Sequence, residues 1–562
     1  MHSPSSIELA MKRVEIQSVL FAAKPSRLAL QSIDCDFTGC RCGAVNVWRN
    51  HAIEPVLDLA RPFLFWGGWN VQARVSDYDD TLMYADHSPA DAELLWLDSS
   101  RYRKDDDCGG QWIDWLASRV RALRAISTAP ILIASWLQGD AEVGKMQALT
   151  ERLPAVYFAD MAAVCAAAGA RLLDARTAIM AGTPVANTAQ TLIARELVCR
   201  WLPAAMLPPI KAVALDLDQT LYAGVLGEDG VQGVELTDAH RQLHSYVKAL
   251  SERGIFIALV SRNERPDVEE LFQRRADFPL KWSDFSAVEI SWGAKVEAIA
   301  RVAEAVRIAP DAVLYVDDNP GELASIAAHL NGVHVVHAAM DAALTERAIS
   351  FYPGLWRWKL EADDARRVGD LKANVEREAL SAQATDPEEY FRSLHVSLTI
   401  RQNPRDELGR LADLCRKTNQ FNIALRRLNQ AELAELMERP DASVASVRLT
   451  DRLSDSGVVA VIVARRYEGK VIVEELCMSC RAMGRQLEDT VVLSAIAAMP
   501  IVAQCEQVAF RVKSGPRNQP ARVWLASLTG SADVDEGLYT LPADAVRGFV
   551  PAPGVQLQYA TQ

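Results

Sequence analysis

The sequence predicts an α/β protein whose central part is a Rossmann-like parallel sheet covered by helices. Apolar runs such as 255–260 and 312–316 show no alternation of polar and apolar residues, which is typical of strands buried on both faces. Stretches with a helical spacing of apolar residues, such as 295–306, lie between these runs. Strands that alternate with helices in this way favour a parallel sheet with helices on its faces.

The first strand of this central part predicts an acidic site. Residues 213–215 are apolar, and Asp216 and Asp218 follow them at the end of the strand. Side chains two residues apart on a strand point to the same side, so we expect both carboxylates in one site. Carboxylates held together repel each other unless a cation neutralises them, which favours a divalent, oxygen-liganded ion such as Mg2+. These two residues alone would also fit a solvated acidic turn.

Polar residues at the ends of further runs support a site rather than a turn. Ser261 follows the run 255–260, Lys295 opens the helical stretch 295–306, and Asp317 with Asp318 follows the run 312–316. Ligands of open parallel sheets bind at the carboxyl ends of the strands, so we expect these side chains to converge there.

Together these residues predict phosphoryl transfer. Asp216 is the expected nucleophile, which would form an aspartyl-phosphate, and Asp218 is placed for proton transfer. Ser261 would bind the phosphate, and Lys295 would neutralise its charge. The candidate catalytic residues are Asp216, Asp218, Thr220, Ser261 and Lys295. The expected Mg2+ ligands are Asp216, Asp218, Asp317 and Asp318, and the expected phosphate- or substrate-binding residues are Arg262, Asn263 and Asn319.

Composition and charge indicate neither a nucleic-acid nor a membrane partner. The 562 residues carry a net charge of −13, which disfavours binding to nucleic-acid phosphates. No apolar run approaches the ~18 residues of a membrane-spanning helix, and the first residues lack a basic stretch followed by an apolar one. The ten cysteines show no zinc or disulfide spacing and are expected to be reduced thiols. We therefore expect a cytoplasmic protein.

The length of the chain predicts three or four domains at about 150 residues each. Residues 1–205 alternate apolar runs with helical stretches, which predicts a separate α/β domain with strands at 63–66, 92–97 and 131–136. We expect the catalytic domain at 206–350 and a partly helical linker at 351–387. Residues 388–562 predict an α+β domain with strands near 395–400, 443–449, 458–464, 471–477 and 507–512.

The catalytic domain leaves no room for a large cap over its site. The intervals 220–261 and 261–295 are each filled by a helix and a strand. Residues 222–235, with four glycines, have room only for a small flap, whose turn is expected at 227–230. A site without a lid is either lined in part by neighbouring domains or accepts a bulky substrate, such as a prosthetic arm carried by a protein.

The motifs of this domain resemble those of the FkbH-like family of the haloacid dehalogenase superfamily. The resemblance is carried by Asp-Leu-Asp-Gln-Thr-Leu-Tyr-Ala-Gly-Val-Leu-Gly-Glu-Asp-Gly at 216–230, Ser-Arg-Asn at 261–263, Trp-Gly-Ala-Lys at 292–295 and Val-Asp-Asp-Asn-Pro at 316–320. Residues 417–422 and 478–485 are similar to the acetyltransferase-like (GNAT-like) C-terminal region of that family. Residues 1–205 resemble, weakly, the esterase-like N-terminal region of its longer members, without their Gly-Asp-Ser and Asp-x-x-His motifs. The resemblance implies a haloacid dehalogenase core between a degenerate esterase-like domain and an acetyltransferase-like domain.

The resemblance also implies a function, that of a Mg2+-dependent phosphatase and glyceryl transferase of polyketide-type biosynthesis. Such enzymes take a three-carbon acyl unit from 1,3-bisphosphoglycerate, remove its phosphates and place it on the phosphopantetheine thiol of an acyl carrier protein. The implied partners are therefore an acyl carrier protein and a phosphorylated three-carbon metabolite.

This sequence departs from the family at three positions. Val260 stands where the family usually has a cysteine that holds the acyl group, and valine cannot act as a nucleophile. Arg262 replaces the usual lysine and Tyr222 the usual tryptophan. A phosphatase for another small phosphorylated substrate, without acyl transfer, is therefore the main alternative. A non-catalytic scaffold that binds a carrier protein is the other, although a scaffold has no need to hold so much charge together.

The third domain leaves two possibilities open. Cys480 is a second candidate thiol, although a buried cysteine at a strand end is the more common case. Residues 481–486 partly resemble the pyrophosphate loop of acetyltransferases, but Gln486 replaces its small third residue. Binding of coenzyme A and a packing role are both compatible with this loop.

Overall fold

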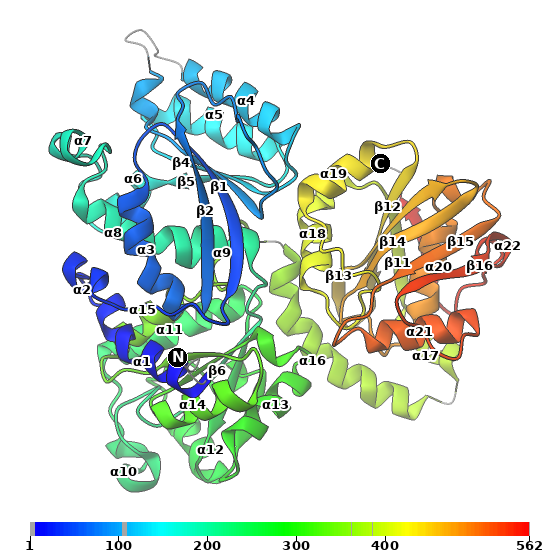
Figure 1. Cartoon of the computed structure of the whole chain (residues 1–562). Helices are drawn as coiled ribbons and strands as arrows, with labels where there is room; N and C mark the ends of the chain where they lie inside the picture. The colour runs from blue at the N-terminus through cyan, green and yellow to red at the C-terminus, as the bar shows by residue number, and fades with distance from the viewer. Residues whose placement is uncertain (1–5, 104–109, 361, 385, 561–562) are drawn as a thin grey trace. The chain divides into compact units, whose positions relative to one another are not determined.

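The structure is a computed structural model that describes residues 6–103, 110–360, 362–384 and 386–560. It forms two compact units, Met1–Leu360 and Glu361–Gln562 (Figure 1). Two all-parallel sheets in the first unit confirm the prediction of an α/β protein with parallel strands. Within the described ranges, no helix has the length and apolar character that crossing a membrane requires.

The first sheet has the strand order β2-β1-β3-β4-β5, with every pair parallel. Its strands are β1 (Arg41–Arg49), β2 (Trp69–Tyr78), β3 (Ala92–Trp96), β4 (Ile131–Ser135) and β5 (Val156–Asp160). The helices of this region are α2 (Arg27–Gln31), α3 (Glu54–Trp66), α4 (Gln111–Arg124), α5 (Gly139–Arg152), α6 (Met161–Ala167), α7 (Ala175–Ala181), α8 (Asn187–Glu196) and α9 (Leu202–Met206). Every residue of β3 and β4 is buried, and apart from Glu93 in β3 and Ser135 in β4 both strands are apolar, as expected for strands covered on both faces.

The strand predicted at 63–66 is wrong, because these residues form the last turn of α3. Eight residues of α3 are buried, including all of Phe63–Trp66. A helix buried on most of its surface loses the polar spacing that identifies an amphipathic helix, and its apolar run then resembles a buried strand. Pro55 at the start of the helix was the signal that favoured a helix.

The second sheet has the order β10-β9-β6-β7-β8 and is also parallel throughout. Its strands are β6 (Ala212–Leu215), β7 (Phe256–Ser261), β8 (Ala287–Ile290), β9 (Val313–Asp317) and β10 (His334–His337). The helices are α10 (Leu226–Gly233), α11 (Asp238–Glu252), α12 (Arg265–Arg274), α13 (Lys295–Ala305), α14 (Pro320–His329) and α15 (Ala342–Ser350). The chain runs outward from β6 to β8 and returns on the other side of β6 at β9, so the β6/β9 boundary is the topological switch point.

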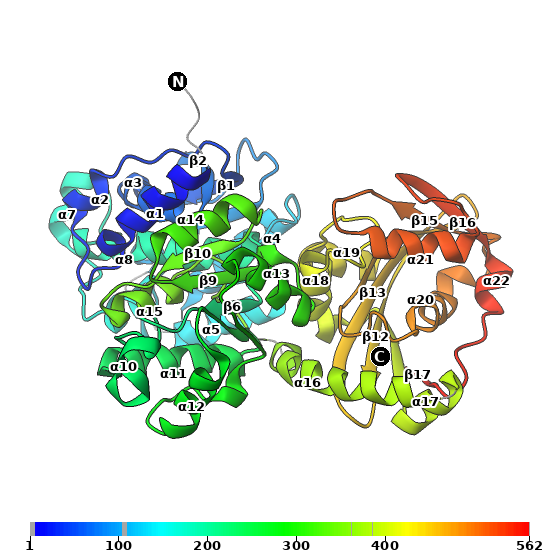
Figure 2. The same cartoon turned by 90° about the horizontal axis from the view of Figure 1, so that it is seen from below.

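The first helix, α1 (Ser6–Leu20), packs against the second sheet as well as against the first region. It contacts α14 and β10 on one side and α3 on the other (Figure 2). Phe21, directly after α1, is fully buried, and its carbonyl oxygen accepts a hydrogen bond from Arg347 Nε at 2.7 Å. The two sheets of the first unit are therefore joined through one hydrophobic core.

The second unit contains a seven-stranded mixed sheet of order β16-β15-β14-β13-β12-β11-β17. Its strands are β11 (Ser397–Gln402), β12 (Ala442–Thr450), β13 (Asp455–Tyr467), β14 (Lys470–Met478), β15 (Gln507–Val512), β16 (Gly537–Pro542) and β17 (Gln556–Ala560). The helices are α16 (Ala362–Gln383), α17 (Pro387–Leu394), α18 (Leu408–Lys417), α19 (Gln430–Glu438), α20 (Glu488–Ala497), α21 (Gln519–Thr529) and α22 (Ala543–Arg547). Each strand predicted for 388–562 overlaps one of β11–β15, and β14 pairs with β15 in parallel.

Strands β14 and β15 pair only over their first residues and then diverge, which leaves a wedge between them. Their register covers Lys470–Val473 against Gln507–Phe510. Residues 421–423 fill the wedge beyond this point. On the β14 side, Ile423 N donates to Leu476 O at 3.1 Å and Met478 N to Phe421 O at 2.9 Å. On the β15 side, Lys513 N donates to Ile423 O, and the side chain of Asn518 donates to Asn422 O, both at 3.0 Å.

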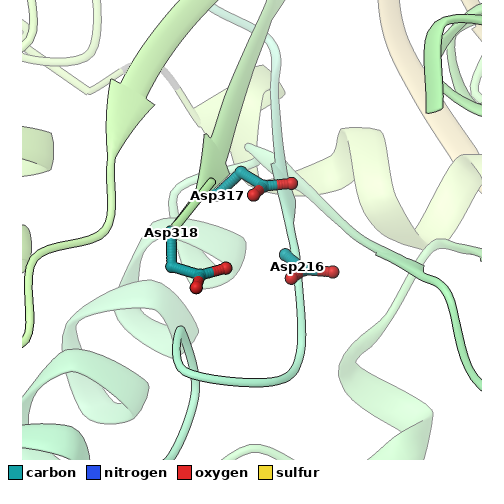
Figure 3. A group of neighbouring side chains, drawn as sticks. All are labelled: Asp216, Asp317 and Asp318. Atoms are coloured by element: carbon teal, nitrogen blue, oxygen red, sulfur yellow. The ribbon is translucent and has the colours of Figure 1, made fainter. Parts of the chain in front are cut away.

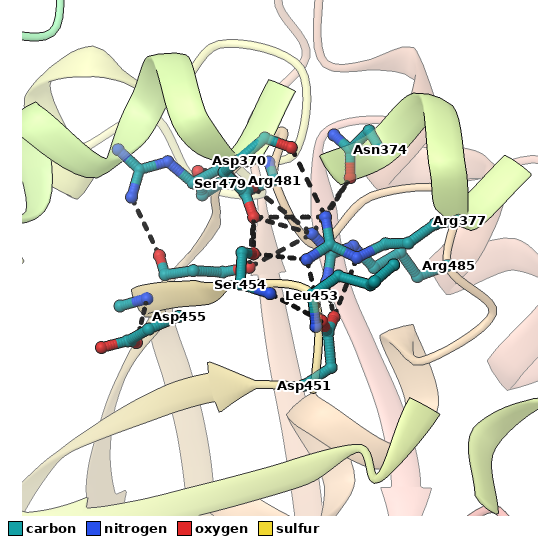
Figure 4. Close-up of polar contacts among 12 residues, drawn as sticks. Asp370, Asn374, Arg377, Asp451, Leu453, Ser454, Asp455, Ser479, Arg481 and Arg485 are labelled. Atoms are coloured by element: carbon teal, nitrogen blue, oxygen red, sulfur yellow. Dashed lines mark hydrogen bonds and ion pairs between the residues drawn. The ribbon is translucent and has the colours of Figure 1, made fainter. Parts of the chain in front are cut away.

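Helix α16, in the segment expected as a linker, packs on β13 through a stripe of polar side chains. The buried residues of this stripe follow helical spacing: Asp363, Arg367, Asp370, Asn374 and Arg377. Arg377 pairs with Asp370 and Asp451, and Arg485 pairs with the same two carboxylates (Figure 4). Gly457, at φ +69°, makes room for the Asp363 carboxylate, because a Cβ there would lie 2.4 Å from Asp363 Oδ1. Ion pairs and hydrogen bonds, rather than an apolar stripe, therefore hold α16 against β13.

Candidate active site

Three acidic residues meet at the switch point of the second sheet. Asp216 directly follows β6, Asp317 ends β9 and Asp318 follows it (Figure 3). One carboxylate oxygen from each residue lies within 4.8 Å of the others. Asp317 is fully buried, Asp216 is 6% exposed and Asp318 is half-buried. Three such carboxylates repel one another, and the site offers the hard oxygen donors that Mg2+ prefers.

Lys295 joins two of these acids. It is the first residue of α13, it is buried, and its Nζ lies 2.9 Å from Asp216 Oδ1 and 2.6 Å from Asp317 Oδ2. Burial raises the pKa of Asp216 to about 7; Lys295 opposes this rise and Asp317 adds to it. Burial works against the charge of Lys295, but Asp216 and Asp317 outweigh it and raise the pKa of the ammonium group. Lys295 is therefore charged at neutral pH, and Asp216 keeps its proton to a higher pH than an ordinary carboxyl group does.

Asp317 has two more contacts within its own strand end. Tyr315 OH donates to Asp317 Oδ2, and the backbone N–H of Asn319 donates to Asp317 Oδ1 at 2.7 Å. Burial, followed by the charge of Asp317, raises the pKa of the Tyr315 hydroxyl, so this group is a donor and not an anion. Sequence reasoning missed Tyr315, although it lies two residues before Asp317 and therefore on the same face of β9.

Asp218 lies outside this acidic group, for a reason that corrects the sequence argument. Strand β6 ends at Leu215, so the alternation of a strand does not extend to Asp218, which lies in a turn. Its carboxylate accepts hydrogen bonds from Tyr222 OH at 2.5 Å, from the backbone N–H of Leu226 at 2.9 Å and from Asn263 Nδ2 at 2.7 Å. The carboxylate of Asp218 is therefore not part of the group formed by Asp216, Asp317 and Asp318. It lies beside Asn263, which also donates to Ser261.

The two predicted hydroxyl groups lie in buried positions. Ser261 ends β7, the strand beside β6, and Asn263 Nδ2 donates to its Oγ at 3.0 Å. Thr220 is 2% exposed, and among the described residues its Oγ1 has no hydrogen-bond partner. A buried hydroxyl without a partner is costly unless a ligand or water binds it.

The remaining predicted binding residues differ in their surroundings. Arg262 has a partly exposed side chain, and its Nη1 forms an ion pair with Glu322 Oε1 at 2.6 Å. Asn319 is the N-cap of α14, where its Oδ1 accepts from Gly321 N at 2.9 Å. Trp292, which sequence analysis noted only as part of a motif, is 69% exposed, and its Nε1 donates to Glu264 Oε1 at 2.8 Å.

The segment expected as a flap is small. Ala223 and Glu235 form an antiparallel bridge at its base, and α10 lies between them. The turn expected at 227–230 is instead helical up to Gly230, whose φ of 66° and ψ of 174° interrupt α10. The flap nevertheless reaches the site, because Tyr222 and Leu226 both donate to Asp218.

The comparisons with known proteins concern the fold. No protein-family model matches the sequence, and no curated protein sequence matches it. A solved structure that resembles the chain is the N-terminal part of the protein BF1531 from Bacteroides fragilis, which contains a phosphatase domain complexed with Mg. The identity is 17% over 61% of this chain and 99% of that chain, with a TM-score of 0.47. The function of this protein is therefore argued from its own residues.

Proposed function

We propose that this protein is a Mg2+-dependent phosphatase of the haloacid dehalogenase type, with Asp216 as the nucleophile. The observation that carries the proposal is the arrangement around Asp216. A buried carboxylate at the switch point of a parallel sheet is bridged to Asp317 by Lys295, with Asp318 completing an acidic group. A purely structural ion pair between Lys295 and two acids would not need the third acid, Asp318.

The residues present fit a Mg2+ ion. Asp216, Asp317 and Asp318 would hold it, since one carboxylate oxygen of each lies within 4.8 Å of the others and Asp318 is only half-buried. When bound, the ion would neutralise negative charge on the phosphoryl oxygens and favour the ionised form of Asp216.

The protein side chains divide the reaction into two steps. In the first, a carboxylate oxygen of Asp216 forms a bond to phosphorus while the bond from phosphorus to the substrate oxygen breaks, and Asp218 gives a proton to that oxygen. In the second, water attacks the aspartyl-phosphate, Asp218 accepts the proton of the water, and phosphate leaves Asp216. Lys295 balances the charge of the transferred group, and Ser261 with Asn263 offers hydrogen-bonding groups beside it.

The test is phosphate release from para-nitrophenyl phosphate with Mg2+ and with EDTA. Asp216→Asn keeps the volume of the side chain but removes the nucleophile, so phosphate release is expected to fall by more than about 10³-fold. Asp238→Asn, an exposed carboxylate paired with Arg241 on α11, is the matched control and is expected to match the parent protein. Parent-like release by Asp216→Asn, or full activity in EDTA, would refute the proposal.

The finer proposal, transfer of a glyceryl-type unit from 1,3-bisphosphoglycerate to an acyl carrier protein, rests on the FkbH-like motifs and on the small flap. Val260 is 1% exposed in β7, and residues 206–350 contain no cysteine, so this region holds no thiol for an acyl-enzyme. The thiol of a carrier arm would then attack the acyl phosphate directly, helped by proximity. The test is the intact mass of candidate carrier proteins after incubation with enzyme, Mg2+ and 1,3-bisphosphoglycerate. Phosphate release without any mass increase would leave a phosphatase for another small substrate.

A further inference from the structure

The outer edge of the second sheet is closed by a side chain from the first helix. β10 is the edge strand, and the backbone of its last residue, His337, meets the side-chain amide of Gln17 in α1. Gln17 Nε2 donates to the carbonyl oxygen of His337 at 2.7 Å, and His337 N donates to Gln17 Oε1 at 3.2 Å. Gln17 is 2% exposed, so this reciprocal pair is shielded from water. It satisfies backbone groups that an edge strand otherwise leaves open.

The ring of His337 continues this contact to the acidic group. His337 Nε2 lies 3.0 Å from the carbonyl oxygen of Asp318. A carbonyl oxygen can only accept, so Nε2 carries the hydrogen and donates it. The residue after β10, Ala338, donates its N–H to the carbonyl oxygen of Asp317 at 2.8 Å. The end of β10 therefore holds the backbone carbonyl groups of both acids at the end of β9, Asp317 and Asp318.

Asp318 depends on this support in a way that the other two acids do not. Lys295 holds the carboxylates of both Asp216 and Asp317. Asp318 is the half-buried member of the group. The hydrogen bond that it receives from His337 of β10 goes to its backbone carbonyl oxygen and not to its carboxylate. A rotation of that peptide would turn the carboxylate away from Asp216 and Asp317, whereas Mg2+ tolerates little departure from octahedral geometry.

We propose that His337 is a positioning residue for the metal site, which fixes Asp318 while Gln17 of α1 fixes His337. The inference rests on the proposed Mg2+ site and extends it to the N-terminal helix. Outer contacts of this kind typically change metal affinity by about 10–100-fold when removed. The loss should fall on Mg2+ binding, because His337 touches a backbone group of a ligand residue and not the substrate.

The experiment measures the Kd for Mg2+ by titration calorimetry on the full chain, together with the kcat for para-nitrophenyl phosphate at saturating Mg2+. His337→Phe keeps a ring but removes the donor, and it is expected to raise the Kd by about 10–100-fold with kcat close to that of the parent. His337→Gln, whose amide nitrogen can donate from the position of Nε2, is expected to restore the parent Kd. His334→Phe is the matched control on the same strand, because it removes a contact with Tyr352 OH at 2.9 Å and leaves Asp318 untouched.

The outcomes separate this inference from the proposed function. An equal Kd for His337→Phe and His334→Phe would overturn the positioning role, even if Asp318→Asn abolishes Mg2+ binding and so supports the metal site. A parent-like Kd in Asp318→Asn would instead refute the metal site itself, and the positioning role with it. Gln17→Leu removes the two hydrogen bonds between α1 and the backbone of His337. It provides a second test if His337→Phe does not fold. Its Kd is expected to rise in the same direction, and an unchanged Kd would also overturn the inference.

Discussion

Replacement of Lys295 by methionine removes the cation between two buried carboxylates. Methionine fills a similar volume, so the change is mainly electrostatic. The Nζ atom lies 2.9 Å from Asp216 and 2.6 Å from Asp317, and both acids are buried. Loss of one partner from a buried ion pair costs about 3–5 kcal/mol, because a charge is left without compensation. Unfolding entropy of about 2.1 cal/mol/K per residue over residues 1–360 converts this cost into a fall in Tm of roughly 4–7 °C.

The cost depends on pH in a direction that follows from Asp216. Its pKa in the folded protein is raised from 3.8 to about 7, so the folded state holds the proton more tightly than the unfolded state does. Stability from this group is therefore present at low pH and is lost as the pH rises through 7. Lys295 lowers this pKa, so without it the pKa rises further and the variant goes on losing stability above pH 7, where the loss in the parent has ended. We expect the fall in Tm to be larger at pH 8 than at pH 5.5, by up to about 2 °C, because one pH unit above 7 corresponds to about 1.4 kcal/mol.

The assay is scanning calorimetry in EDTA at both pH values. The matched control is Lys248→Met, whose pair with Asp284 spans 3.1 Å and is partly exposed, with the lysine side chain 40% accessible. Exposed pairs contribute about 0–1 kcal/mol, so this variant should lose less than about 1.5 °C at either pH. Equal losses for the two lysine variants, or a Lys295→Met loss that does not grow with pH, would refute the electrostatic account of the site.

The remaining predictions concern metal binding and the second unit. Mg2+ must displace the proton of Asp216, whose pKa is about 7, so the apparent affinity should rise by about tenfold from pH 6 to pH 8 in titration calorimetry; an affinity independent of pH would contradict Asp216 as a ligand. Arg377→Met leaves Asp370 and Asp451 without one of their buried partners and should cost about 3–5 kcal/mol in the unfolding transition of the second unit. Arg392→Met, which breaks an exposed pair with Glu388, should cost at most about 0.5 kcal/mol, and similar losses in the two arginine variants would show that α16 is not held by its ion pairs.

Much of the acidic site could be predicted because each of its residues marks the end of an apolar run or the start of a helix. Parallel strands bring their carboxyl ends to one edge, so Asp216, Asp317 and Lys295 meet although they are far apart in the chain. Asp218 could not be placed in the same way, because the strand would have to continue for three residues after Leu215 to include it. The ends of strands are the part of a strand that a sequence pattern predicts least accurately. An error of one residue there is enough to place a side chain on the wrong face of the sheet.

Other features had no signal in the sequence because they depend on tertiary contacts. Gln17 and His337 lie far apart in the chain, and no local pattern links an amide on a helix to the edge of a sheet. The buried side of helix α16 could not be identified from the sequence for a different reason. Its inward stripe carries Asp363, Asp370 and Arg377 instead of apolar residues, and pattern reasoning treats charged residues as exposed. Only the opposing arginines and aspartates of the folded unit show that this stripe is buried.

The wedge between β14 and β15 has a consequence for any ligand that would use it. Residues 421–423 make four hydrogen bonds to the two sides of the wedge, and a ligand would have to displace them first. At about 0.5–1.5 kcal/mol each, these bonds amount to about 2–6 kcal/mol. The open form of the wedge would then be a minor population, and apparent affinity falls in proportion to that population. A ligand that binds the open wedge would appear roughly 30-fold to 10⁴-fold weaker than its contacts alone would give.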